Sequence, residues 1–575
     1  MTPDELETVE TNVFALFAQG RLDEALALGV QALERAGERP RLLLAMGLVA
    51  IQRNDPANAR TLLEAARALA PRDADIAYNL GVALQQSGAL EAAGACWEDA
   101  VRLHPGHLAA LKNLAALRTD QGRFEDVPAL CRAVLAQTPD DYDALNWMGF
   151  AHGQRSRFAD AEAAYRALAE RHPQNPDAHY RHGIIARDMG DDALAVESLR
   201  RAVALDPGHV PAHFALAQAL LAEGRYAEGF AEYEWRKKRD AWPTDTADAP
   251  EWRGETDPAV SLLVTSEQGH GDTLQFLRFL PQAAARVGRL TVSTHPSLRT
   301  LVERLECVRG VEEIHRETAT YDRKIPIMSL PHVLGITDRN AVPSPLFPDV
   351  PRDQRLFSLG PADPLLRVGV VWSGNAQYLN NARRSCAFTD MARLFDAVPD
   401  AAFYSFHRGE PAGDFRAHAN AVDMSPHLGN FEDTARFVKG LDLVVSVDTA
   451  FLHLAGSMGM ETWALLHHAR DWRWKNGGRP DLWYPGMRIY LQPAPDDWTD
   501  VFDRVIADLR TKAAQRNGAD PARAPKATRG RARPGGIARG SDPKTPGRDC
   551  GGSDARLRAR PRNPSRSPGP TPAAS

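Results

Sequence analysis

Residues 161–173 have the sequence Ala-Glu-Ala-Ala-Tyr-Arg-Ala-Leu-Ala-Glu-Arg-His-Pro, a small residue followed twelve positions later by proline. The same pair recurs along the chain at intervals of 34 residues. A constant interval of this length predicts stacked structural repeats rather than one globular core. The prolines are Pro71, Pro105, Pro139, Pro173 and Pro207, and the small residues are Ala59, Ala93, Val127, Ala161 and Ala195.

The pattern extends beyond these five copies in both directions. Ala25 and Gly229 continue the first series of small residues, which gives seven units. Small residues at facing positions let two antiparallel helices approach closely, and each proline ends a helix. Turns are predicted between the helices, for example at Gln19-Gly20-Arg21 and Glu223-Gly224-Arg225. A second series of small residues consists of Gly47, Gly81, Ala115, Gly149, Gly183 and Ala217.

The array over residues 1–235 closely resembles the tetratricopeptide repeat. The resemblance implies an α-solenoid, a right-handed superhelix with a concave groove that binds proteins or peptides. The alternative is that the repeats form an oligomerisation surface or a spacer. In neither case do the repeats themselves carry catalytic chemistry.

Residues 236–258 are rich in Asp, Thr, Pro and Trp and are predicted to be a connector. Beyond it, short apolar segments alternate with helical ones, which predicts βαβ units and parallel sheets. We expect two α/β lobes at 259–345 and 367–510, separated by the linker 346–366, with a ligand cleft between the C-terminal ends of their strands. The predicted strands are 259–265, 289–293, 311–315, 323–328, 367–372, 401–406, 442–447, 461–466 and 487–491.

The first motif of chemical interest is Ser266-Glu-Gln-Gly-His-Gly-Asp272, which follows a strand and begins a helix. Gly269 and Gly271 permit positive φ and close approach of a ligand. Asp272 has two possible roles, as a cap of the helix or as a general base that faces the cleft. Pro281 is expected to interrupt the same helix.

The second motif is Trp372-Ser-Gly-Asn375, followed by Arg383 and Arg384. A turn of small residues with exposed N–H groups and nearby guanidinium groups suits a phosphate. The alternative is a polar loop with solvated arginines.

The third motif is Val447-Asp-Thr-Ala-Phe-Leu-His-Leu-Ala-Gly-Ser-Met-Gly459. A buried strand is expected to end at Asp448, and Thr449 can cap the helix that follows, whose N-terminus favours an anion such as a diphosphate. His453 shares the helix face of Thr449 and is either a core side chain or part of a site. Gly459 is expected to end the helix.

Together these motifs resemble those of the ADP-heptose:lipopolysaccharide heptosyltransferases, glycosyltransferase family 9, which have the two-lobed GT-B fold. The Asp-Thr-x-x-x-His element matches the signature of the C-terminal lobe, and the Gly-His-Gly-Asp loop matches the N-terminal glycine loop. A subgroup fused to tetratricopeptide repeats is further suggested by Ser329-Leu-Pro331, Asp471-Trp-Arg-Trp474 and Trp483-Tyr-Pro485. His270 and Ser405-Phe-His407 depart from the family pattern.

The resemblance implies roles for ten residues. Asp272 would be the catalytic base for the acceptor hydroxyl, and Arg384 would neutralise the leaving diphosphate. GT-B enzymes generally need no metal, and no Asp-x-Asp sequence ends a strand, so neither a metal nor another cofactor is expected. The remaining donor-binding residues would be Gly269, Gly271, Ser373, Gly374, Asn375, Asp448, Thr449 and His453.

The function implied is that of a glycosyltransferase (hexosyl-, heptosyl- or N-acetylhexosaminyl-) acting on a protein or glycan acceptor. A nucleotide-sugar donor and a protein or peptide in the repeat groove are the expected partners. The alternative is a non-catalytic tetratricopeptide repeat scaffold with a degenerate transferase-like region.

Charge separates the body of the chain from its C-terminal end. The net charge of −5 combines residues 511–575, with 15 Lys+Arg and 4 Asp, and an acidic remainder. This basic segment, rich in Pro and Gly, is expected to be a disordered tail without a specific nucleic-acid partner, since no aromatic residue is present to stack on bases. The polar start, the scattered cysteines and the lack of a long apolar segment predict a cytoplasmic protein without a membrane span.

Overall fold

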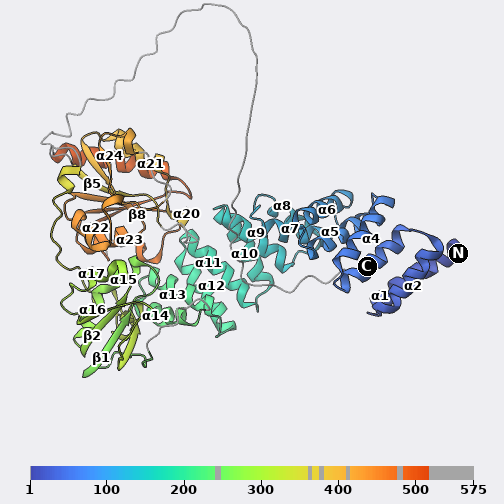
Figure 1. The fold of residues 1–575 in the computed structure, drawn as a ribbon, viewed down its shortest axis with the longest axis horizontal. Coiled ribbons are helices and arrows are strands. Elements are labelled where there is room, and N and C mark those ends of the chain that lie inside the picture. The colour runs from blue at the N-terminus through green and yellow to red at the C-terminus, as the bar shows by residue number, and fades with distance from the viewer. Residues whose placement is uncertain are drawn as a thin grey trace, which may run out of the picture. The chain divides into compact units, whose positions relative to one another are not determined.

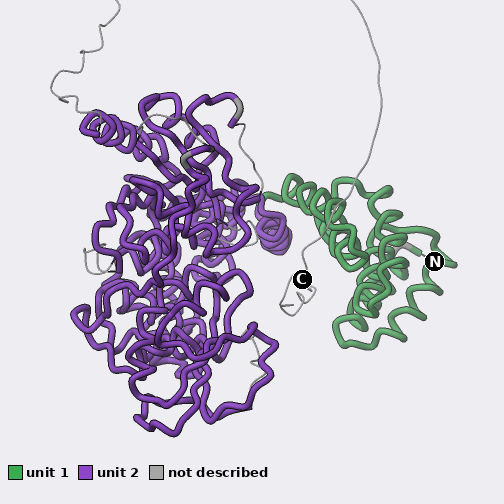
Figure 2. Tube along the Cα trace, turned by 60° about the vertical axis from the view of Figure 1, so that its left-hand side comes forward, with its two compact units in different colours: residues 1–105, 522–575 green, residues 106–521 purple. Residues whose placement is uncertain are grey.

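The computed structural model describes residues 2–239, 248–359, 366–374, 381–409, 415–475 and 483–516. They fall into two compact units, the first ending at Pro105 and the second beginning at Gly106 (Figure 2). Paired α-helices come first along the chain and two parallel sheets follow (Figure 1). Within the described ranges, no helix is long and apolar enough to cross a membrane.

The helices up to Tyr233 confirm the predicted repeats. The first unit contains α1 (Pro3–Ala18), α2 (Leu22–Ala36), α3 (Pro40–Gln52), α4 (Pro56–Leu69), α5 (Ala74–Gln86) and α6 (Leu90–Leu103). The second unit continues with α7 (Leu108–Asp120), α8 (Val127–Gln137), α9 (Tyr142–Gln154), α10 (Phe158–Arg171), α11 (Pro176–Met189), α12 (Asp192–Leu205), α13 (Val210–Ala222) and α14 (Tyr226–Tyr233).

The start of each of these repeats is fixed by a side chain two residues after the proline that recurs every 34 residues. Asp73, His107, Asp141, Asn175 and His209 each accept a hydrogen bond from a backbone N–H in the first turn of the next helix. Proline therefore ends one helix, and the cap satisfies N–H groups that the next helix would otherwise leave unpaired.

Close packing within a repeat depends on matched residue sizes. A Cβ on Gly81 would lie 2.4 Å from the indole nitrogen of Trp97, and a Cβ on Gly149 would lie 2.7 Å from the Tyr165 ring. In each pair the large residue follows the glycine by 16 positions and fills the space that the missing side chain leaves. The predicted role of the second glycine series is confirmed at these positions.

The first lobe is a four-stranded parallel sheet with the strand order β3-β2-β1-β4. The predicted break near Pro281 is confirmed, since a 3-10 turn separates α15 (His270–Phe276) from α16 (Leu280–Ala284). Two further helices are α17 (Arg299–Val302) and α18 (Leu330–Val333). The strands are β1 (Asp257–Thr265), β2 (Val287–Thr294), β3 (Gly310–Glu313) and β4 (Arg323–Pro326).

The second lobe is a six-stranded parallel sheet with the order β10-β9-β8-β5-β6-β7. Counted along the lobe this is 3-2-1-4-5-6, the order of doubly wound dinucleotide-binding sheets. Sequence inspection missed β7, which has only three residues. The strands are β5 (Leu366–Val371), β6 (Ala401–Ser405), β7 (Ala421–Asp423), β8 (Leu443–Val447), β9 (Thr462–Leu466) and β10 (Met487–Leu491).

The helices of the second lobe correct one predicted boundary. The last, α24 (Trp498–Arg516), continues through residues 511–516, which were expected to begin the tail, because Ala513 still packs against the core. The rest of the predicted tail lies outside the described residues. The other helices are α19 (Leu356–Leu359), α20 (Asn381–Arg384), α21 (Phe388–Ala397), α22 (Phe431–Val438) and α23 (Ala450–Ser457).

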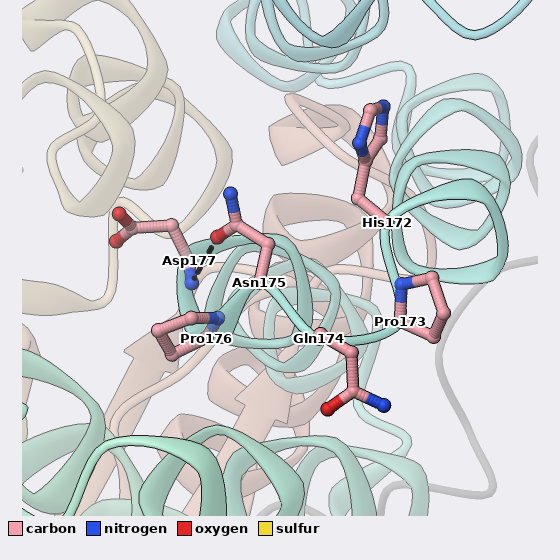
Figure 3. A pocket seen from close by; sticks show the side chains of 6 residues that line it. All are labelled: His172, Pro173, Gln174, Asn175, Pro176 and Asp177. Atoms are coloured by element: carbon pink, nitrogen blue, oxygen red, sulfur yellow. Dashed lines mark hydrogen bonds between the residues drawn. The ribbon is translucent and has the colours of Figure 1, made fainter.

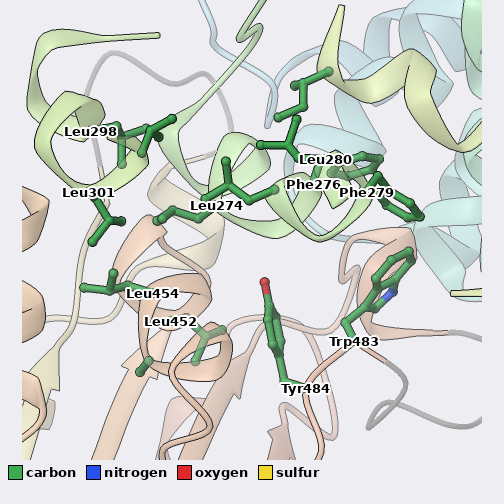
Figure 4. Packing of buried hydrophobic residues seen from close by; sticks show 14 of the residues in the cluster. Leu274, Phe276, Phe279, Leu280, Leu298, Leu301, Leu452, Leu454, Trp483 and Tyr484 are labelled. Atoms are coloured by element: carbon green, nitrogen blue, oxygen red, sulfur yellow. The ribbon is translucent and has the colours of Figure 1, made fainter. Parts of the chain in front are cut away.

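One hydrophobic core joins the last repeat to both lobes. It includes Phe230 of α14, Leu274 and Phe276 of α15, Leu452 of α23, and Trp483. Figure 4 shows the leucine and phenylalanine side chains of the first lobe above Leu452, with Trp483 beside them. The last repeat is therefore part of the same folded body as the sheets.

A buried ion pair lies at the junction between the last repeat and the first lobe. Arg236, which follows α14 and is 1% exposed, donates from Nη2 to Glu267 Oε1 at 2.6 Å and from Nε to Glu267 Oε2 at 2.8 Å. Glu267 lies two residues before Gly269, the first residue of the glycine loop, and also accepts from the backbone N–H of Met328 at 3.0 Å. The end of β1 is thus fixed to the repeats by a bidentate contact.

Replacement of Glu267 by Gln should destabilise the second unit by about 3 kcal/mol, because Arg236 would keep its buried charge and lose its main counter-charge. Glu303→Gln is the matched control, since Glu303 pairs with Arg299 on an exposed surface of the same lobe at 2.8 Å and should cost only about 0.5 kcal/mol. Urea denaturation measures both. A loss for Glu267→Gln no larger than that of the control would contradict the assignment.

Candidate functional site

The candidate residues follow the strands at which each sheet reverses its order. In the second lobe the reversal lies between β5 and β8, so Ser373 and Asp448 stand at the same edge of the sheet. In the first lobe it lies between β1 and β4, and the glycine loop follows β1. Such reversal points are where open parallel sheets bind ligands, in the crevice beyond the carboxyl ends of the strands.

Asp272 has two partners that together fix its carboxylate. Oδ2 accepts from the backbone N–H of Gly269 at 2.9 Å, which caps α15. Oδ1 accepts from Nη2 of Arg473 at 2.6 Å, and the side chain is 21% exposed. The capping role is therefore observed. A carboxylate can accept more than these two hydrogen bonds, so capping does not exclude a catalytic role.

The two glycines of the loop act through close approach rather than through positive φ. Gly269 has φ −96°, whereas the preceding Gln268 has φ 58°. A Cβ on Gly271 would lie 2.7 Å from Cδ2 of His453. The expectation of positive φ at the glycines is wrong, and Gly271 instead lets the first turn of α15 pack on α23. The signature motifs of the two lobes are in direct contact here.

Gly374, in the described part of the phosphate loop predicted after β5, is bound by a residue that the sequence did not single out. Asn381 accepts from the backbone N–H of Gly374 at 3.1 Å and from Nε of Arg384 at 3.4 Å. A Cβ on Gly374 would lie 2.6 Å from Nη2 of Arg384. Ser373, Gly374 and Arg384 are thus gathered together, while Asn375 lies outside the described residues.

Asp448, Thr449 and His453 surround the start of α23. Nδ1 of His453 lies 2.8 Å from the hydroxyl of Tyr484, and Nε2 lies 3.8 Å from Oδ1 of Asp448. Thr449 occupies the N-cap position, but its side chain makes no capping hydrogen bond and its Oγ1 lies 3.1 Å from Oγ of Ser446. The predicted cap by the Thr449 hydroxyl is therefore wrong, because that hydroxyl turns toward the end of β8.

Burial shifts the pKa values of the two ionisable groups in opposite directions. It raises the pKa of Asp448 to about 6, an effect to which the negative charge of Asp471 adds. It lowers the pKa of His453 to about 3, assisted by the positive charge of Arg473. His453 is therefore neutral at physiological pH and can both accept and donate a hydrogen bond.

Arg473 is the main site residue that sequence reasoning did not assign. Its side chain is 8% exposed and donates to Asp272, to Asp471 at 2.9 Å and to Gln275 Oε1 at 2.7 Å. The signal was present in the sequence as a lone cation between two tryptophans after a buried strand, Trp472-Arg473-Trp474. Spacing alone did not show that this segment reaches the other lobe.

The charges around α23 suit an anionic ligand. The guanidinium groups of Arg473, Arg278 and Arg384 all lower the pKa of His453 electrostatically, so all three are close enough to act on it. Arg278 is 2% exposed and donates to the carbonyl oxygens of Gln275 and Trp483. Guanidinium groups and a helix N-terminus are the usual protein partners of a diphosphate.

A pocket on the surface of the repeats is lined by none of the candidate site residues. Figure 3 shows that it is lined by six consecutive residues, His172 to Asp177, which form the turn after α10 and the first two residues of α11. Asn175 Oδ1 accepts there from the backbone N–H of Asp177 at 2.9 Å, which caps α11. The Asn175 side chain thus serves the structure of the repeat.

Comparison with known proteins supports the repeats. Residues 44–95, 148–210 and 180–243 match the tetratricopeptide repeat family model. Among solved structures, the chain is similar to YrrB, described as a TPR protein with an unusual peptide-binding site, at 18% identity and a TM-score of 0.31, over 32% of this chain and 95% of that one. MamA from Desulfovibrio magneticus RS-1 matches at 20% identity and a TM-score of 0.28, over 30% and 98%.

A longer match extends over most of the chain. Protein FlbA of Caulobacter vibrioides (strain ATCC 19089 / CIP 103742 / CB 15) is 25% identical over 540 residues, which cover 84% of this chain and 87% of FlbA. Its name states no activity. The chain thus contains tetratricopeptide repeats, and two parallel β-sheets follow them.

Proposed function

We propose that this protein is a glycosyltransferase of the GT-B type, which moves a sugar from a nucleotide-sugar to a protein or glycan acceptor. One observation carries the proposal. Gly271 follows the strand at the reversal point of the first sheet, His453 follows the strand at the reversal point of the second, and the two residues pack against each other. Two facing Rossmann-like lobes with their motifs in contact form the arrangement expected for a donor and an acceptor that meet in one cleft.

In this proposal the second lobe binds the donor. Arg384 and the N-terminus of α23 stabilise the negative charge that develops on the diphosphate as the glycosidic bond to it breaks. Neutral His453, oriented by Tyr484, hydrogen-bonds to the donor without adding charge. No metal or other cofactor is assigned a role.

The first lobe would bind the acceptor. Asp272, held by the Gly269 N–H and Arg473, is the candidate base that accepts the proton of the attacking hydroxyl. The repeats would recruit the acceptor protein or a partner. A scaffold without catalysis is the alternative, and the fixed pairing of Asp272 is the observation that favours it.

Replacement of Arg384 by Ala should weaken nucleotide-sugar binding about tenfold, because a charge-assisted contact of ~1.4 kcal/mol to the diphosphate would be lost. Isothermal titration with UDP-, GDP- and ADP-glucose and the corresponding diphosphates measures the affinity. Arg393→Ala is the control, since Arg393 pairs with Asp503 on the surface of the same lobe. Equal affinities of the two variants would remove Arg384 from the donor site, and no binding by the parent to any probe would favour the scaffold.

Asp272→Asn should lower the transfer or donor-hydrolysis rate by about 10²- to 10⁴-fold while the donor Kd stays within twofold, because Asn keeps an oxygen for the Gly269 N–H but cannot take up a proton. The matched control is Asp433→Asn. Asp433 caps α22 by accepting from the N–H of Asn430 at 3.3 Å, as Asp272 caps α15. A rate for Asp272→Asn equal to that of the parent would show that Asp272 only caps the helix.

The shifted pKa of Asp448 predicts a pH-dependent stability. Its carboxyl has a pKa of about 6 in the folded chain, against 3.8 for an ordinary Asp. Between these values the folded state binds more protons than the unfolded state, so the contribution of Asp448 to stability falls as pH rises and is lowest above about pH 6. His453, with its lowered pKa, acts in the opposite direction over pH 3 to 6.5.

Asp448→Asn should therefore be more stable than the parent near pH 7, with an advantage that grows by about 3 kcal/mol, to order of magnitude, between pH 4 and pH 7. The quantity to compare is the difference in unfolding free energy between the two proteins, because groups that titrate equally in both contribute nothing to it. Urea denaturation at intervals of half a pH unit measures it. A difference that does not change with pH would contradict the raised pKa of Asp448.

A further inference from the structure

Four consecutive residues, Trp472-Arg473-Trp474-Lys475, connect the repeats to the candidate site and are called here the bridging segment. Trp472–Trp474 form a turn of 3-10 helix, and all four residues are buried, with whole-residue exposures between 1% and 7%. Because a 3-10 helix has three residues per turn, side chains three apart lie on the same side. Trp472 and Lys475 therefore share one side, and Arg473 and Trp474 occupy the others.

The first and last residues of the bridging segment contact the repeats. The Trp472 ring meets the rings of Phe230 and Tyr233 of α14 edge-on, at centroid distances of 6.4 and 6.3 Å. Nζ of Lys475 donates to Oδ1 of Asp192 in α12 at 2.7 Å and to the carbonyl oxygen of Arg187 in α11 at 3.0 Å. A buried ammonium paired in this way has little freedom to move.

The two middle residues contact the candidate site. Arg473 holds Oδ1 of Asp272 and also the side chain of Gln275. The Trp474 ring is stacked on the ring of His453 at a centroid distance of 5.4 Å. The bridging segment thus touches the proposed base of the first lobe and the proposed donor-binding histidine of the second.

A second contact to the same repeats lies beside the phosphate loop. Nη2 of Arg383 donates to the carbonyl oxygen of Gly153 at 3.0 Å, and Nη1 lies 3.8 Å from Oδ2 of Asp188. Arg384, the next residue, faces Gly374. Arg473 and Arg384 therefore each lie in a segment that a nearby cation anchors on the repeats, Lys475 in the first case and Arg383 in the second.

We propose that Lys475 and Asp192 are positioning residues, through which the repeats hold Arg473 against Asp272 and Trp474 against His453. The repeats from α9 to α14 are then a structural part of the site and more than a recruiting surface. The consequence for sugar transfer rests on the proposed function, whereas the mechanical connection does not.

Hydrogen–deuterium exchange of the full chain tests the connection. Asp192→Asn removes the counter-charge of Lys475 without changing any residue of either lobe, and backbone exchange in residues 269–276 should become at least fivefold faster, because Arg473 would no longer fix the cap of α15. Asp160→Asn is the matched control. Asp160 lies in the first turn of α10 as Asp192 does in α12, and it pairs on the surface with Arg157 at 2.6 Å. Unchanged exchange in 269–276 for Asp192→Asn would overturn the proposal.

Two variants of Lys475 protect the test against simple loss of folding. Lys475→Arg keeps a cation within reach of Asp192 and should retain the slow exchange of 269–276, whereas Lys475→Met should match Asp192→Asn. Equal exchange for Lys475→Arg and Lys475→Met would overturn the proposal, because the slow exchange would then not depend on a cation at position 475.

Binding of nucleotide-sugar separates this proposal from the proposed function. With whichever of UDP-, GDP- or ADP-glucose the parent binds best, Asp192→Asn should raise Kd at least fivefold and Asp160→Asn less than twofold. Equal Kd values for parent and Asp192→Asn would overturn the link to the donor site. If the parent binds none of the three, the proposed function fails, and the exchange data alone decide whether Lys475 and Asp192 position Asp272.

Discussion

The buried pair between Arg236 and Glu267 determines how the rest of the second unit is organised. Two charges out of water are stable only when each satisfies the other in good geometry, so the chain after α14 has one position relative to the end of β1. The glycine loop starts at Gly269, two residues after Glu267. Its placement over α23 therefore depends on the last repeat as much as on the sheet from which it leaves.

This dependence changes what the repeats are for. A repeat array on a flexible connector would recruit a partner and leave the chemistry to another domain. Here the core continues from Phe230 into both lobes, and the segment Trp472–Lys475 contacts the repeats with its first and last residues and the candidate site with its two middle residues. In the proposal made above, the repeats nearest the sheets are therefore a structural part of the site.

Much of the fold followed from the sequence because its signals are local and periodic. The helix pairs, the break before Pro281 and all strands except β7 repeat or alternate in ways that a single chain displays. The motifs that end β1, β5 and β8 were also found, since a buried strand followed by small or polar residues is a local pattern. Two features escaped prediction for different reasons. Arg473 meets Asp272 across 201 residues of sequence, which local patterns cannot show. The Thr449 hydroxyl has a second local partner, Ser446, and lies close to it instead of capping α23.

The central claim is that the motifs of both lobes form one site for a nucleotide-sugar. Hydrogen–deuterium exchange of the parent chain, with and without a bound UDP-, GDP- or ADP-glucose, tests this claim most directly, because it reports on each lobe separately. The account predicts that one donor slows exchange in residues 269–276 and in residues 448–457 together. Slower exchange in only one of the two segments, or in neither at saturating concentrations of every donor, would contradict it.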